Sequence, residues 1–383
     1  MLFSKEELRR LIVPLMIEQI LAVTIGMADT MMVANVGEAA VSGVSLVDSI
    51  NILLINIFSA MATGGAVVAS QYIGRQDRQN ACSAAKQLIY SSAFIALLLG
   101  LLALVGGEHL LRLVFGSVDA DVMAYAETYF WLSALSYPFL AVYNAGAALF
   151  RSMSNSSISM KTSILMNIIN IGGNALLIYG FDMGVAGAGT ATLVSRATGA
   201  VVMMWLLRNR HNLIYVEHLF HYRLDWQMVK RILRVGVPNG LENGMFQVGK
   251  VLVSSLIAMF GTTAITANAI CNNVGAFSNL PGSAMSLAMI TVIGQCIGAG
   301  DYDQAKYYVR KLMLVTVIGM AALNVGIFFA APPLRGMYQA SDATYDLALF
   351  VLRYNCVCTL WWPPSFALPN ACAPRATQVQ RWW

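Results

Sequence analysis

The segment PLMIEQILAVTIGMADTMMVANVG, from Pro14 to Gly37, is an almost unbroken apolar run that contains two carboxylates, Glu18 and Asp29. A helix rises about 1.5 Å per residue, so this segment can cross a hydrocarbon core of about 30 Å. Three helical turns bring the two carboxylates to nearly the same face. A carboxylate at membrane depth costs about 2.5–3.5 kcal/mol on insertion scales, and such groups usually face a protein interior or a watery cavity. This favours a functional role for Asp29; pairing with a neighbouring helix is the alternative.

The composition indicates an integral membrane protein. Hydrophobic residues make up 58% of the chain and charged residues 11%, and the mean hydropathy is +0.64. Soluble domains carry about 25% charged residues. The first apolar segment is too long for a signal peptide and has no small-residue cleavage site, so we expect it to insert as the first spanning helix.

The positive charges predict the orientation in the membrane. If the N-terminus is cytoplasmic, 19 of the 24 Lys and Arg residues lie in cytoplasmic segments, 2 lie outside and 3 lie within helices. This is the positive-inside pattern, and it predicts a multi-pass protein of the cytoplasmic membrane with a cytoplasmic N-terminus. The same distribution argues against a nucleic-acid partner. The six cysteines are scattered without the spacing of metal or redox sites, so we expect no metal.

Hydropathy and turn residues predict ten membrane spans joined mostly by short loops. The predicted spans are 10–35, 44–72, 86–106, 121–149, 158–181, 185–207, 230–258, 264–298, 308–331 and 343–368. A longer basic and polar connector, 208–229, divides the chain. We therefore expect a first lobe at 1–207, a second lobe of four spans at 230–370 and a polar tail at 371–383.

The two sides of the connector are internal repeats. A shift of 224 residues carries Pro14, Glu18 and Gly37 onto Pro238, Glu242 and Gly261. The same shift carries Gln71-Tyr72-Ile73-Gly74 onto Gln295-Cys296-Ile297-Gly298. Because the shift spans six helices, an even number, the second copy enters the membrane in the same direction as the first. The repeats are therefore predicted to be parallel, and transport folds commonly bind substrate between such halves. Duplication for packing alone is the alternative.

Polar residues within the spans suggest two kinds of site. In the fifth span, Asn167, Asn170 and Asn174 are spaced three and four apart and share one helical face. Together with Asp29 and Thr192 of the sixth span, Asn170 and Asn174 could form a small proton or cation site. Amide hydrogen bonds that merely join the helices are the alternative.

The second half carries a different set. Asn239, Asn243, Gln247 and Lys250 form one stripe of the seventh span, and Asn268 and Asn272 lie on one stripe of the eighth. The position equivalent to Asp29 is Val253, so the acid is not duplicated. We therefore expect the first half to handle a coupling ion and the second half to line a substrate path. Glu18, Glu242 and Asp48 are candidates for a gating or structural role.

With these residues in hand, the chain resembles the multidrug and toxic compound extrusion (MATE) family of transporters over nearly its whole length, up to about Asn370. The resemblance is carried by Pro14 with Gly26-Met27-Ala28-Asp29-Thr30, Gln71-Tyr72-Ile73-Gly74, Asn170 through Asn174, Pro238-Asn239-Gly240-Leu241-Glu242, and Gln295-Cys296-Ile297-Gly298-Ala299-Gly300. It implies an all-α membrane protein with twelve helices in two six-helix lobes around a central cavity. It also implies that Asp29 matches the first-helix acid of ion coupling, with Asn170, Asn174 and Thr192 near it.

The chain departs from this family in two places. Some members have an acid at the position of Asn174, and an amide cannot be deprotonated at neutral pH. After Asn370 the sequence becomes polar and unlike the family, so two expected spans are missing. We therefore expect a C-terminal truncation or frameshift.

The functional hypothesis is an antiporter without cofactors, driven by H⁺ or Na⁺, that exports drugs or organic cations by alternating access. It would act as a monomer among membrane lipids. One alternative is a flippase for lipid-linked precursors, which would favour a strongly cationic cavity; another is an inactive truncated fragment. A membrane enzyme would need a convergent set of acids, metal ligands or a nucleophile with its base, and the sequence does not offer one.

Overall fold

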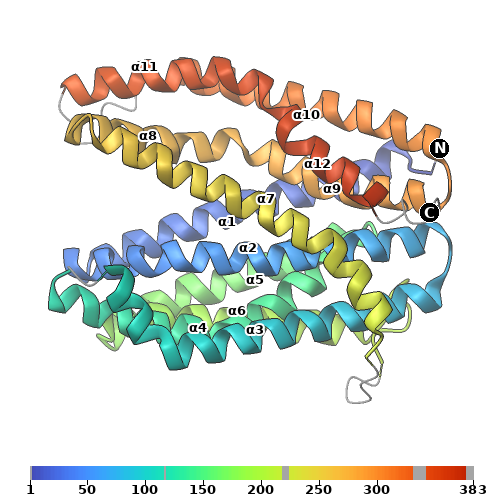
Figure 1. Ribbon diagram of the computed structural model, residues 1–383, viewed down its shortest axis with the longest axis horizontal. Coiled ribbons are helices and arrows are strands. Elements are labelled where there is room, and N and C mark those ends of the chain that lie inside the picture. The colour runs from blue at the N-terminus through green and yellow to red at the C-terminus, as the bar shows by residue number, and fades with distance from the viewer. Residues whose placement is uncertain (1, 116–117, 218–223, 331–341, 377–383) are drawn as a thin grey trace.

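The computed structural model describes residues 2–115, 118–217, 224–330 and 342–376. Long helices dominate these residues, as the sequence predicts (Figure 1). The helices are α1 (Lys5–Ala34), α2 (Glu38–Gly74), α3 (Arg78–Phe115), α4 (Ala120–Ser152), α5 (Ser156–Asn174) with the π-helical turn η1 (Ala175–Gly180), α6 (Gly184–Leu207), α7 (Trp226–Ala258), α8 (Thr262–Ser278), α9 (Leu280–Gly298), α10 (Tyr302–Ala330), α11 (Asp342–Cys358) with the 3₁₀ turn η3 (Thr359–Trp361), and α12 (Pro363–Ala376).

Two of the predicted spans are broken helices. The span 264–298 becomes α8 and α9, which separate at Asn279 just before Pro281. The span 343–368 becomes α11, η3 and α12, with the break ahead of Pro363-Pro364. Proline lacks the backbone N–H and clashes with the preceding turn, which explains both breaks. By the 224-residue shift, α8 and α9 together correspond to the single long helix α2.

The bounds of the connector and of the tail differ from the sequence prediction. The connector ends earlier than residue 229, because α7 already begins at Trp226. Residues 371–376 of the predicted polar tail are helical, since α12 continues to Ala376. The rest of that tail, 377–383, lies outside the described residues.

Equivalent residues form the turns of the two lobes. The second spans, α2 and α8, follow Gly37 and Gly261, whose φ angles are 142° and 90°, a region that favours glycine. The third span α3 is capped by Asp77, which accepts hydrogen bonds from the Asn80 backbone N at 3.1 Å and Nδ2 at 2.6 Å. These bonds lower the pKa of the Asp77 carboxyl below its usual value. Asp301, its equivalent, caps α10 in the same way.

The lobes are parallel repeats, as predicted. In Figure 1, α2 to α6 form the lower group and α8 to α12 the upper group, α1 and α7 cross between the two groups, and equivalent helices run in the same direction. The groups converge at the end that holds Gly74 and Gly298, called the base below. A Cβ on Gly74 would lie 2.1 Å from the Gln295 carbonyl oxygen, and one on Gly298 would lie 2.1 Å from the Gln71 carbonyl oxygen. This reciprocal contact places the relating axis between α2 and α9.

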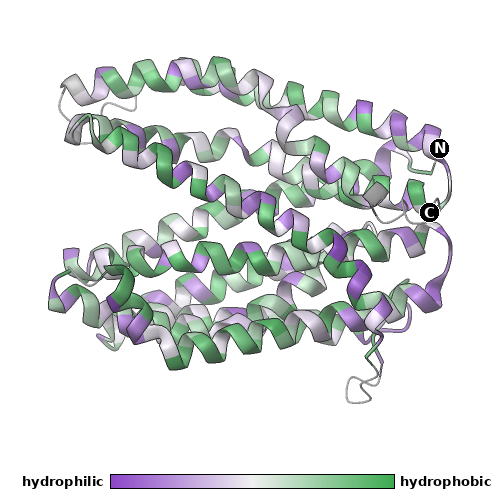
Figure 2. Cartoon of the chain, in the orientation of Figure 1, coloured by the Kyte–Doolittle hydropathy of each residue, from purple (hydrophilic) through white to green (hydrophobic). Residues whose placement is uncertain are grey.

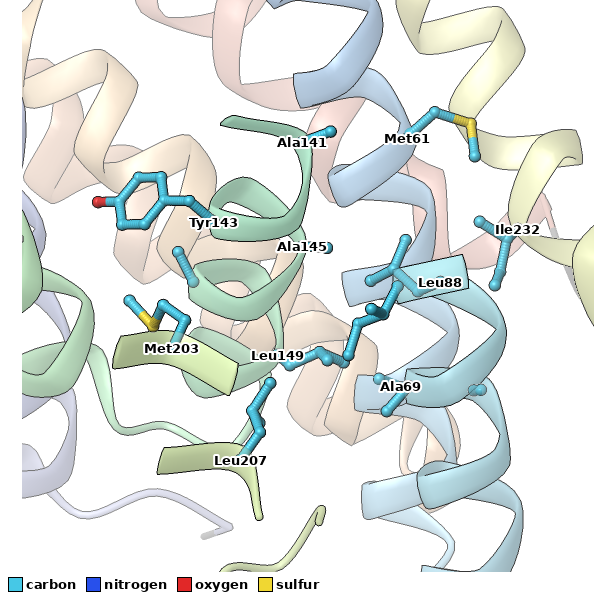
Figure 3. Packing of buried hydrophobic residues seen from close by; sticks show 14 of the residues in the cluster. Met61, Ala69, Leu88, Ala141, Tyr143, Ala145, Leu149, Met203, Leu207 and Ile232 are labelled. Atoms are coloured by element: carbon cyan, nitrogen blue, oxygen red, sulfur yellow. The ribbon is translucent and has the colours of Figure 1, made fainter. Parts of the chain in front are cut away.

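A large hydrophobic cluster fills the first lobe (Figure 3). Leu88 of α3, Leu149 of α4 and Met203 of α6 are fully buried in it. Ile232 of α7 packs against the same cluster, so the second lobe begins on the core of the first. In the opposite sense, Leu11 of α1 is buried among residues of α9 and α10. Each lobe therefore contributes its first helix to the packing of the other.

Apolar side chains also cover the outside of the bundle (Figure 2). Along α3, for example, Leu102, Val105 and Leu113 are 61%, 87% and 85% exposed. Seven of the described helices are long and apolar enough to cross a membrane. An apolar exterior of this extent is what a lipid-facing surface requires.

Candidate functional site

Asp29 lies at the interface of α1 with the end of α5. Its Oδ1 accepts a hydrogen bond from Asn174 Nδ2 at 2.5 Å. Asn174 is fully buried and is the last residue of α5 before the π-helical turn η1. Such turns are rare and occur often at functional sites, because the extra residue re-aims the neighbouring side chains. The structure thus brings together the acid and the amide that the sequence singled out.

Asn170 and Thr192 form a second contact one turn away. Asn170 Nδ2 donates to Thr192 Oγ1 at 3.1 Å, and both side chains are buried. Among the described residues, the amide oxygens of Asn170 and Asn174 are buried without a hydrogen-bond partner. An unpaired buried acceptor costs free energy, and a bound cation or water would relieve that cost.

Asp48 belongs to a separate polar group in the same lobe. Asn51 Nδ2 donates to Asp48 Oδ1 at 3.3 Å, and Tyr137 OH donates to Asn51 Oδ1 at 2.7 Å. One residue before Tyr137, Ser136 Oγ accepts from Arg196 Nη1 at 2.7 Å. This group therefore joins α2, α4 and α6 inside the first lobe.

A cavity of about 460 Å³ lies between the two lobes. It is lined by Gln19 of α1, Ser59 and Thr63 of α2, Asn239, Glu242, Asn243 and Phe246 of α7, Ser283, Ser286, Leu287 and Ile290 of α9, and Trp362, Ser365, Pro369 and Asn370 of α12. Most of these side chains are amides or hydroxyls. Glu242 is the one charged residue among the described residues of this lining.

The cavity lies on the axis that relates the repeats. The 224-residue shift pairs Gln19 with Asn243 and Ser59 with Ser283, and all four residues line it. Equivalent positions of both lobes can face one space only if that space is at the axis. The second lobe alone adds Trp362, whose ring centroid lies 5.9 Å from that of Phe246.

The predicted substrate path is only partly at this cavity. Asn239 and Asn243 line it, whereas Gln247, Lys250, Asn268 and Asn272 lie outside its lining. Lys250 instead holds its Nζ 5.4 Å from the centroid of the Phe246 ring. Of the four predicted residues of the α7 stripe, only Asn239 and Asn243 therefore line the cavity.

The duplicated glutamates have different surroundings. Glu18 is buried and forms an ion pair with Arg151, with Nη1 and Oε1 3.0 Å apart. Ser159 Oγ donates to its other oxygen at 2.6 Å. Glu242 is exposed at the cavity, and among the described residues it forms no ion pair. Glu18 is thus held by an ion pair and a hydrogen bond, whereas Glu242 lines the cavity.

Sequence reasoning missed most of the cavity lining. Ser59, Thr63, Ser283 and Ser286 are small hydroxyl residues within apolar helices, where they commonly bond their own backbone. One signal could have identified two of them. Ser59 and Ser283 are equivalent in the repeat. Asn243, which the sequence predicts, is likewise equivalent to Gln19, which it does not predict.

The comparisons with known proteins agree with this architecture. The family model MatE matches residues 14–176 and 238–373. The probable multidrug resistance protein NorM of Thermotoga maritima is 26% identical over 353 residues, which cover 90% of this chain and 74% of that protein. The multidrug export protein MepA of Staphylococcus saprophyticus is 22% identical over 342 residues, covering 89% and 75%.

Solved structures share the fold. An outward-facing conformation of a multidrug resistance MATE family transporter matches with a TM-score of 0.87 at 19% identity, covering 98% of this chain and 84% of that chain. A MATE structure in the bent conformation matches with a TM-score of 0.85 at 18% identity, covering 97% and 82%. The chain therefore belongs to the MatE family, the multidrug and toxic compound extrusion transporters, and is a multi-pass membrane protein.

Proposed function

We propose that this protein is a secondary active antiporter that exports organic cations, including drugs, across the cytoplasmic membrane in exchange for H⁺ or Na⁺. The observation that carries the proposal is the cavity on the axis between the lobes, because repeat-equivalent residues from both sides line it. A site at such an axis can open to one side or the other when the lobes rock. The positive-inside pattern supports a cytoplasmic N-terminus.

The lining of the cavity supports an organic cation as substrate. Glu242 supplies a negative charge, and Phe246 with Trp362 supplies two aromatic faces of the kind that bind cations. A volume of about 460 Å³ is in the range of small-molecule sites. A flippase for lipid-linked phosphates would need basic residues, and this lining contains neither Lys nor Arg.

Asp29 is the proposed coupling residue. A cation that binds its carboxylate removes the cost of a charge at membrane depth. Asn174 fixes the carboxylate by donating to Oδ1. Since Asn174 and Asn170 are amides, they can supply oxygen ligands to the cation but cannot release protons.

Coupling requires that the cation and the substrate favour different conformations. Only a ligand with unequal affinity for the two states can shift their balance. The cation at Asp29 then favours one state, substrate at Glu242 favours the other, and the free energy of the ion gradient drives export. The proposed protein works as a monomer, because one chain supplies both lobes.

The test is efflux from proteoliposomes under an imposed H⁺ or Na⁺ gradient, with an organic cation such as ethidium inside. Asp29→Asn should abolish gradient-driven efflux while the purified variant elutes as the wild type does in size-exclusion chromatography. Asp119→Asn removes an exposed carboxylate outside the spans and should transport normally. Gradient-driven efflux by Asp29→Asn at the wild-type rate would overturn the proposal.

A further inference from the structure

Arg196 is a charged residue in the interior of the first lobe. It lies midway along α6, a helix long and apolar enough to cross the membrane. Its guanidinium donates to Ser136 Oγ at 2.7 Å and is only partly exposed. Among the described residues it forms no ion pair within 4.0 Å. A guanidinium at membrane depth is costly, so its charge needs an electrostatic partner nearby.

The neighbourhood of Arg196 contains two carboxylates. Its charge acts on both Asp29 and Asp48, and on the hydroxyls of Tyr129 and Tyr137. Two hydrogen bonds connect Asp48 with the turn of α4 to which Arg196 donates. Tyr137 follows Ser136 on α4 and donates to Asn51, which in turn donates to Asp48.

These contacts distinguish the two acids. Asp48 is joined through Asn51 and Tyr137 to the turn of α4 that holds the guanidinium. Asp29 is held instead by Asn174 of α5. With both acids ionised, the group of two carboxylates and one guanidinium carries a net charge of −1.

We propose that Arg196 is a fixed internal cation that balances Asp48, so that the first lobe takes up one coupling cation, at Asp29, in each transport cycle. The inference rests on the proposed function, because it assumes that Asp29 binds the driving ion. Without the guanidinium, two carboxylates in a medium of low dielectric would require two cations. Arg196 is therefore a positioning residue. It determines how many ions the lobe binds, but it does not contact those ions itself.

The test counts cations bound to the purified protein, with ²²Na⁺ in equilibrium binding and with a pH indicator for protons. The wild type should bind one cation and Arg196→Gln two. The double variant Arg196→Gln/Asp48→Asn should return to one, and Arg196→Lys should keep one because it keeps the charge. A binding count of one or none for folded Arg196→Gln would overturn the inference, as would a count of two for the double variant.

Asp48→Asn provides a second test that does not depend on the folding of Arg196→Gln. With Asp48 neutral, the guanidinium acts on Asp29 alone, so the affinity for the cation should fall by about tenfold or more. An unchanged affinity would contradict the proposed charge balance. Asp29→Asn separates the two hypotheses. If Asp29→Asn still binds the cation, the proposed function fails. If Asp29→Asn does not bind the cation but Arg196→Gln still binds only one, the inference about Arg196 fails and the proposed function stands.

Discussion

Glu18 and Glu242 occupy equivalent positions of the repeat but have different partners. Arg151, the partner of Glu18, is at the end of α4. Glu242 is exposed at the cavity, and among the described residues it forms no ion pair. The Glu18 carboxylate is therefore neutralised by a described partner, whereas the carboxylate of Glu242 lines the cavity.

This difference predicts that replacing glutamate by glutamine affects ligand binding at position 242 and stability at position 18. Glu242→Gln should weaken binding of an organic cation by about fivefold, as one charge in a wet cavity contributes about 1 kcal/mol. Binding of an uncharged analogue of the same size should not change. Fluorescence titration of the purified variants measures both, and an equal loss for the two ligands would contradict a charge-selective role.

Glu18→Gln should instead lower stability. It leaves Arg151 buried without its counter-ion, which typically costs about 3–5 kcal/mol. The melting temperature in detergent should fall, whereas that of Glu242→Gln should remain near the wild-type value. Equal melting temperatures for the two variants would show that the ion pair of Glu18 contributes little.

At the scale of elements, the start of α3 holds the connector. Arg78 donates to the carbonyl oxygens of Arg210 at 2.7 Å, Asn212 at 2.8 Å and Leu213 at 3.1 Å. Its guanidinium also lies 5.0 Å from the centroid of the Tyr215 ring. One side chain therefore fixes the described part of the segment that joins the lobes.

Arg78→Ala should release this segment. Hydrogen bonds to a charged group contribute about 1.5–3 kcal/mol, so trypsin should cleave after Arg208 or Arg210 about tenfold faster. Arg75→Ala is the matched control, because Arg75 is exposed, lies in the same turn and contacts none of the connector residues that the structure describes. Mass spectrometry of the fragments over time gives both rates; equal rates would contradict the anchoring role.

At the scale of the whole molecule, the lobes are joined at the base. Gln295 Nε2 donates to the Ser152 carbonyl oxygen at 2.7 Å, and Thr291 Oγ1 donates to that of Arg151 at 3.1 Å. From the other lobe, Gln71 Nε2 donates to the Pro374 carbonyl oxygen at 2.6 Å. The two glutamines are equivalent in the repeat. The proposed alternating access requires that these contacts break, since they join the lobes at the base.

A larger residue at the crossing of α2 and α9 should open the base. A side chain on Gly74 would collide with the backbone of Gln295, so Gly74→Leu should force the lobes apart there. Gly106→Leu is the control, because no heavy atom lies within 4 Å of a Cβ at Gly106. Spin labels at Asn155 and Tyr302, on a cysteine-free background, report the separation. Unchanged distances in Gly74→Leu would show that the base does not depend on this contact.

The sequence by itself determined the class of fold and the parallel repeat. Apolar length fixes which segments can span a membrane, and residues at a constant shift reveal the duplication. It also placed Asn167, Asn170 and Asn174 on one buried face, because helical periodicity is a local property.

Only the tertiary structure decided which polar residues meet. Asn174 bonds Asp29 across 145 positions, and Arg151 neutralises Glu18, whereas among the described residues Glu242 forms no ion pair. Lys250 and Asn268 lie outside the cavity lining, whereas Gln19, the repeat equivalent of Asn243, is part of it. Periodicity fixes the face on which a side chain lies, but the packing of distant helices decides what that face contacts, and this packing depends on the shapes of all of them together.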